Sequence, residues 1–182
     1  MKLRRTGSLI FLAIAIMAAA YVIAIMQRGF SAREEPSLLE AAVARAARNM
    51  AIPREAKYAP NPFQATPENL QEGLEHFAMH CATCHANDGS GQTEIGRNLY
   101  PKVPDMRSDQ TQHLTDGQIY YIISNGIRMT GMPAWADSHR SQDIWRFVIF
   151  VRHLPQLTAQ EENGMKQFNP KGPEHHEEEE GK

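Results

Sequence analysis

The chain has 182 residues, enough for one domain of moderate size with appendages. Its formal net charge of -2 argues against nucleic acid as a partner. The charge is uneven, because residues 1–27 hold three basic side chains and no acid, whereas residues 174–182 hold five acids and one lysine. The two cysteines lie close together, which excludes a disulfide framework.

The first predicted element is an apolar helix. Ser8 to Met26 is a run of 19 uncharged residues. As a helix it would be about 28 Å long, close to the hydrocarbon thickness of a bilayer. A cleaved signal peptide has a shorter apolar core, and here the run continues past Ala18 and Ala20, which could form a cleavage site. We therefore expect residues 1–27 to be an uncleaved anchor in membrane lipid, with a cleaved signal as the alternative.

The basic residues before this helix predict its orientation. Lys2, Arg4 and Arg5 should remain in the cytoplasm, which places the chain after Gln27 on the far side of the membrane. The expected protein is single-pass in a bacterial inner membrane, with its main domain in the periplasm.

Residues 28–65 are predicted to be a linker that contains one amphipathic helix, 37–50. Ser37 and Glu40 have the spacing of a capping box. The apolar side chains of this helix share one face: Leu39, Val43, Ala46 and Met50. That face either packs on its own domain or contacts a partner subunit, and both interpretations stay open. Four prolines over 53–67 indicate extended chain.

A second helix should begin with Thr66 as N-cap and Pro67 at its first position, and run into Cys81. Gly73 is costly inside a helix, so it indicates that another element packs closely against the backbone there.

This helix leads into the main motif, Cys81-Ala82-Thr83-Cys84-His85. Two cysteines separated by two residues and followed by histidine are typical of c-type haem attachment. The cysteines can reach the two vinyl groups of a porphyrin, and His85 can bind the iron. A thioredoxin-like centre would need a βαβ pattern, a structural zinc site would need more ligands, and a disulfide would leave His85 unexplained.

The rest of the chain is also predicted to be helical. Thr115 and Gln118 form a capping box for a helix that ends at Asn125-Gly126, and a strong helix should run from Ser141 to about Leu154. Residues 156–182 are expected to be a short helix and an acidic disordered tail. The tail contains His175 and His176, followed by a run of four glutamates, so a metal site is the alternative there. With few strand-like stretches, the predicted fold class is all-α.

Taken together, residues 66–155 resemble class I cytochrome c. The resemblance rests on the Cys-x-x-Cys-His motif, on Gly73 and Phe77 ahead of it, on Gly131 to Trp135, and on Pro104 to Met106. It implies the class I cytochrome c fold after an N-terminal transmembrane helix, and one haem c attached through Cys81 and Cys84.

The resemblance also implies roles for single residues. It makes His85 and Met132 the iron ligands, with Met129 as the weaker candidate for the second position. The carbonyl of Pro104, or alternatively of Pro101, should accept a hydrogen bond from His85. Where the first and last helices of the domain cross, Gly73 and Phe77 should meet Phe147 and Phe150.

A haem with two protein ligands has no position for substrate, so we expect an electron carrier between redox partner proteins and not an enzyme. The alternative is a cytochrome subunit of a quinone-linked dehydrogenase or a terminal oxidase. A peroxidase or gas sensor would need an open sixth position, and Met132 argues against it.

Overall fold

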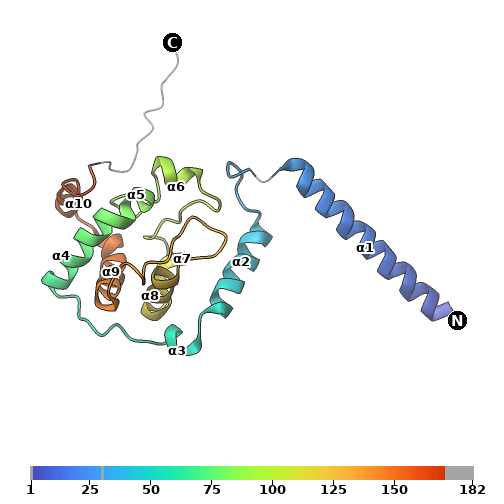
Figure 1. The fold of residues 1–182 in the computed structure, drawn as a ribbon, viewed down its shortest axis with the longest axis horizontal. Helices are drawn as coiled ribbons and strands as arrows, with labels where there is room; N and C mark the ends of the chain where they lie inside the picture. Colours follow the sequence, from blue (N-terminus) through green and yellow to red (C-terminus); the bar gives the residue numbers. More distant parts are fainter. Residues whose placement is uncertain (1, 30, 171–182) are drawn as a thin grey trace, which may run out of the picture. The chain divides into compact units, whose positions relative to one another are not determined.

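The computed structural model describes residues 2–29 and 31–170, and the chain divides into two compact units, 1–32 and 33–182. The first unit is helix α1, Lys2–Arg28 (Figure 1). Its stretch Ser8–Gln27 is long and apolar enough to cross a membrane, and none of its side chains is buried. This confirms a single apolar helix of the length that an anchor needs.

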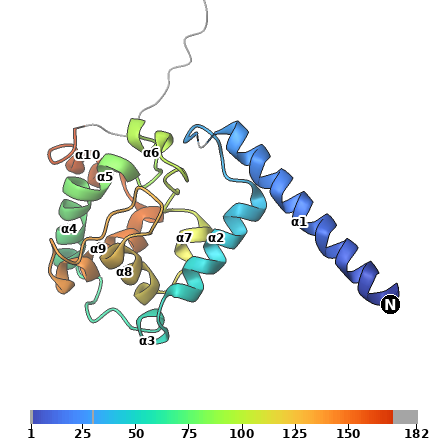
Figure 2. The same cartoon turned by 45° about the vertical axis from the view of Figure 1, so that its right-hand side comes forward.

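The second unit is helical, and its described residues include no strand, as the sequence predicts. The α-helices of its first half are α2 Leu38–Ala51, α3 Arg54–Lys57, α4 Pro67–His76, α5 Ala82–His85 and α6 Glu94–Asn98. Those of its second half are α7 Asp109–Gln112, α8 Asp116–Asn125, α9 Ser141–His153 and α10 Ala159–Met165. A π-helical turn, Phe77–Cys81, joins α4 to α5, and a 3₁₀ turn, Leu154–Gln156, follows α9. Figure 2 shows α4, α5, α8 and α9 gathered on one side of this unit.

The core of this unit lies where α4 crosses α9. A Cβ atom placed on Gly73 would lie 2.4 Å from the carbonyl oxygen of Arg146, so only glycine permits this approach. Next to the crossing, the rings of Phe77 and Phe150 pack with their centroids 5.0 Å apart, and both side chains are buried together with Phe147. The close packing predicted at Gly73 is therefore confirmed.

Helix α8 packs against α9 and adds its own side chains to this core. Thr115 and Gln118 form the predicted capping box at its start. The rings of Tyr120 and Trp145 stack 4.1 Å apart. The guanidinium of Arg152 on α9 donates to Asp116 at 2.8 Å, which holds the end of α9 to the start of α8.

Residues 52–65, expected to belong to the linker 28–65, instead pack on the domain. Ile52 is buried, and Phe63 lies against the core. The amide of Asn61 donates to the carbonyl oxygen of Trp145 at 3.0 Å. These long-range contacts explain why the proline-rich stretch is not a free connection. The acidic tail, for which disorder or a metal site was predicted, falls in residues 171–182, which lie outside the described residues.

The close crossing predicts that alanine will change the stability differently at two helical glycines. Gly73→Ala should lower the free energy of unfolding by about 1–3 kcal/mol, because its methyl group must push α4 away from the backbone of α9. Gly164→Ala in α10 is the matched control, since a Cβ there meets nothing within 4 Å. It should leave stability unchanged or raise it by up to about 1 kcal/mol. Urea unfolding of the intact protein measures both, and equal stability of the two variants would contradict the close crossing.

Candidate haem-binding site

Helix α4, the π-helical turn and α5 form one continuous helical rod, residues 67–85, that carries both cysteines and His85. Thr66 caps its start by accepting a hydrogen bond from the backbone N–H of Asn69 at 3.3 Å, and Pro67 occupies the first turn as predicted. The rod then widens into a π-helical turn that ends at Cys81, a feature frequent at functional sites that the sequence pattern did not predict.

The chain after this rod folds back onto it. Ala86 has a φ of +62°, which ends the helix directly after His85. The backbone N–H of Gly91 then donates to the carbonyl oxygen of His85 at 2.8 Å. The hydroxyl of Thr93 donates to the carbonyl oxygen of Cys84 at 3.1 Å. Both carbonyl groups are therefore satisfied, and the turn bearing Cys84 and His85 is held from both sides.

The chemical state of the three side chains suits covalent haem attachment. Cys81 and Cys84 are both free thiols, so the alternative of a disulfide between them does not apply. Burial and the neighbouring Cys84 raise the pKa of Cys81 to about 12, and burial raises the pKa of Cys84 as well. Burial lowers the pKa of His85 to about 4, so its imidazole is neutral at pH 7 and keeps a lone pair for a metal.

The hydrogen bond predicted for His85 is not formed. Its Nδ1 atom is buried and has no hydrogen-bond partner in the described part of the chain. Neither Pro104 nor Pro101 therefore supplies the expected carbonyl acceptor. The segment is held elsewhere, because the backbone N–H of Val103 donates to Gly96 at 3.2 Å and that of Met106 to Gly89 at 2.8 Å.

Met132 lies in a tightly bonded loop between α8 and α9. Its backbone N–H donates to the hydroxyl of Thr130 at 3.1 Å, and its carbonyl accepts from Ile127 at 3.2 Å. The loop begins at Gly126, where a Cβ would lie 2.6 Å from the Met132 carbonyl oxygen. The loop is therefore held in one conformation by its own backbone and by Thr130.

The two methionines of this loop differ in environment. Met132 is half-buried and packs against the hydrophobic core, as do Cys81, Met106 and Trp135. Met129 is 91% exposed, with a φ of +63°. Of these two thioethers, the Met132 side chain is the one directed to the core that Cys81 also borders. Met106 also packs against this core, although the sequence did not single it out as a ligand.

These residues fit a haem. The two unpaired thiols can bond covalently to the vinyl groups of a porphyrin, and a neutral buried imidazole and a thioether are ligands suited to its iron. Among the residues that the structure describes, the buried Nδ1 of His85 has no hydrogen-bond partner, so this ring has capacity for a further contact.

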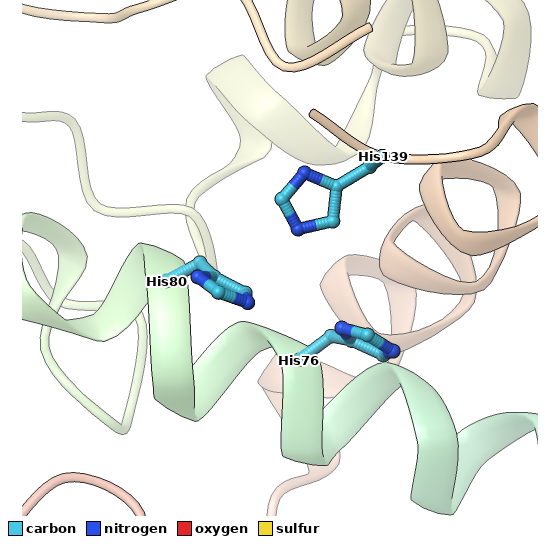
Figure 3. A group of neighbouring side chains, drawn as sticks. All are labelled: His76, His80 and His139. Atoms are coloured by element: carbon cyan, nitrogen blue, oxygen red, sulfur yellow. The ribbon is translucent and has the colours of Figure 1, made fainter. Parts of the chain in front are cut away.

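The structure also brings together three histidines for which the sequence gave no joint role. His76 on α4, His80 in the π-helical turn and His139 before α9 direct their rings into one space (Figure 3). The spacing of His76 and His80 was a usable sequence signal, because residues four apart share a helix face. His139 comes from a distant part of the chain, and only the tertiary fold places it there.

Comparison with known proteins agrees with the motif. Residues 68–151 match the family described as cytochrome c oxidase, cbb3-type, subunit III. The chain is 33% identical over 85 residues to the cbb3-type cytochrome c oxidase subunit FixP of Azorhizobium caulinodans, a match covering 46% of this chain and 27% of FixP. It is 27% identical over 100 residues to the quinohemoprotein alcohol dehydrogenase ADH IIB of Pseudomonas putida, covering 54% of this chain and 13% of that protein. The chain thus matches only a small part of each of these relatives.

Proposed function

The chain belongs to the class I c-type cytochromes, and from this we propose that it carries single electrons between respiratory partners through one covalently bound haem. The observation that carries the proposal is the pair of free thiols beside a buried, neutral His85 on one helical turn. Electron transfer is the chemistry of the family, and the donor, the acceptor and the attachment of the haem are parts of the proposal.

In this proposal each site residue has one task. Cys81 and Cys84 would hold the haem as thioethers, and His85 and Met132 would bind its iron. When bound, the haem supplies a one-electron couple between ferric and ferrous iron. The neutral imidazole of His85 binds without losing a proton, and the uncharged thioether of Met132 favours the ferrous state. The buried aromatic core formed by Phe77, Phe147 and Phe150 keeps water away from this side of the site.

If Met132 fills the sixth position on the iron, no iron site is left for substrate. The protein is then an electron carrier and not an enzyme. The N-terminal helix fits a membrane anchor, and its basic flank in the sequence supports a periplasmic haem domain. An anchored carrier diffuses in the membrane plane, where its redox partners would also lie.

Replacing single methionines tests the ligand assignment. Met132→Ala should abolish the sulfur-to-iron charge-transfer absorption of the ferric protein, because alanine offers no donor atom. Met129→Ala should keep that band, since Met129 is 91% exposed. Met106→Ala is the matched control for a half-buried methionine at the same core. Loss of the band in either control, with its retention in Met132→Ala, would overturn the assignment.

A second candidate function, a subunit of a larger respiratory complex, is favoured by helix α2. Its apolar face was expected either to pack on the domain or to contact a partner. Leu39 is 74% exposed, Val43 59% and Met50 79%, and α2 buries none of its own residues. A row of exposed apolar side chains on one helix face is typical of a surface that another protein covers. FixP is itself named as an oxidase subunit, which agrees with this alternative.

Purification in mild detergent separates the two functions. A stable stoichiometric complex supports the subunit, and a lone haem protein supports the mobile carrier. If the chain is a subunit, Leu39→Asp with Val43→Asp should release it from the complex, because two charges would be buried at the contact. Ala44→Asp is the matched control, as it is exposed on the same helix but lies off the apolar face. Release by Ala44→Asp alone would contradict a contact through this face.

A further inference from the structure

The three histidines near the start of the haem motif form a compact group. One ring nitrogen from each of His76, His80 and His139 lies within 4.8 Å of the other two. Figure 3 shows the rings of His76 and His80 standing on one side of their helix and the ring of His139 facing them from the opposing loop. None of the three is among the residues proposed to hold the haem, and His80 directly precedes Cys81 in the π-helical turn.

The fold holds this group in place from both sides. His76 and His80 sit on the rod that Gly73 fixes against α9. His139 is held by its backbone N–H, which donates to the carbonyl oxygen of Trp135 at 3.0 Å, and its ring contacts that of Phe147 at 5.3 Å between centroids. The three side chains are therefore brought together by backbone packing and not by chance overlap of long flexible side chains.

The protonation of the group suits a metal ion. The partial desolvation of this exposed side chain, and then the proximity of His139 and His76, lower the pKa of His80, which favours its neutral form. The hydroxyl oxygen of Ser138 lies 3.0 Å from Nδ1 of His139, so it can accept a hydrogen bond from an Nδ1–H group and leave the lone pair of Nε2 free for a metal. The Nδ1 of His76 is buried without a partner in the described structure.

Packing alone leaves this arrangement incomplete. Three imidazoles that were charged together would repel one another, whereas each neutral ring keeps one nitrogen lone pair that is free to bind a cation. A cation at the centre would bind one lone pair from each ring, at the nitrogens that lie within 4.8 Å of one another. Neutral imidazole is a preferred ligand of Zn²⁺ and Cu²⁺.

We propose that His76, His80 and His139 bind one divalent transition-metal ion, with Zn²⁺ as the reference ion and solvent in its fourth position. Zinc–nitrogen bonds of about 2.0–2.1 Å place tetrahedral ligand atoms about 3.4 Å apart. The nitrogens already lie within 4.8 Å of one another, and His80 is exposed, so a side-chain rotation can close the site. The ion would tie the loop that carries Met132 to the rod that carries Cys81.

Equilibrium dialysis of the full-length, haem-loaded protein against Zn²⁺ tests this site. His175 and His176 are first replaced by alanine in every sample, so that the tail cannot contribute. This parent protein should bind one zinc per haem. His80→Ala and His139→Ala should each weaken binding by at least about tenfold, since losing even a supporting residue of a metal site costs that much. His113→Ala, which removes an exposed histidine outside the group, is the matched control.

The thermal unfolding midpoint gives a second readout. It should rise with zinc concentration in the parent protein and in His113→Ala, because an ion bound only to the folded state stabilises it. It should not rise in His80→Ala. An unchanged haem absorption spectrum establishes that each variant is folded. The proposal is overturned if the parent protein binds no zinc, or if His80→Ala and His139→Ala bind it as tightly as the parent.

Discussion

The close crossing of α4 and α9 is the contact on which the rest of the domain depends. With no side chain at Gly73, the backbone of α4 approaches the carbonyl of Arg146, and Phe77 and Phe150 pack beside it. The same rod continues through the π-helical turn to Cys81 and His85. A change in the crossing would therefore shift the haem motif relative to the core that borders Met132.

Burial then sets the chemistry of the motif. His85 is surrounded by protein, and the cost of burying a charge keeps its imidazole neutral at pH 7. The same burial keeps Cys81 a thiol. An uncharged donor set is suited to a redox centre, since the iron can change its charge while the surrounding ligands keep theirs. The loop of Met132, the proposed second ligand, is held by hydrogen bonds to Thr130 and Ile127.

Local signals predicted much of this. Caps at Thr66 and Thr115 located two helices, the single glycine at position 73 indicated the crossing, and the motif predicts a haem site. Features that depend on contacts far apart in the sequence were missed. The proline-rich residues 52–65 pack on the domain because Asn61 reaches Trp145, which no local pattern reveals.

For the candidate site, the spacing of Cys81, Cys84 and His85 predicts haem attachment, and the structure places all three on one helical segment. The acceptor for His85 depended on how a long irregular segment folds, and Pro104 does not supply it. The π-helical turn and the approach of His139 to His80 also arise from tertiary packing. Periodicity reports which residues share one face of a helix, and it says nothing of the loop that comes to lie opposite that face.

We propose that this domain holds one haem through thioether bonds to Cys81 and Cys84, and intact-mass measurement of the purified protein after extraction with acidified acetone decides whether it does. A thioether-bound haem resists extraction, so the expected mass is that of the polypeptide plus one haem. A mass equal to the polypeptide alone, with the haem in the acetone phase and two free thiols on the chain, would contradict it.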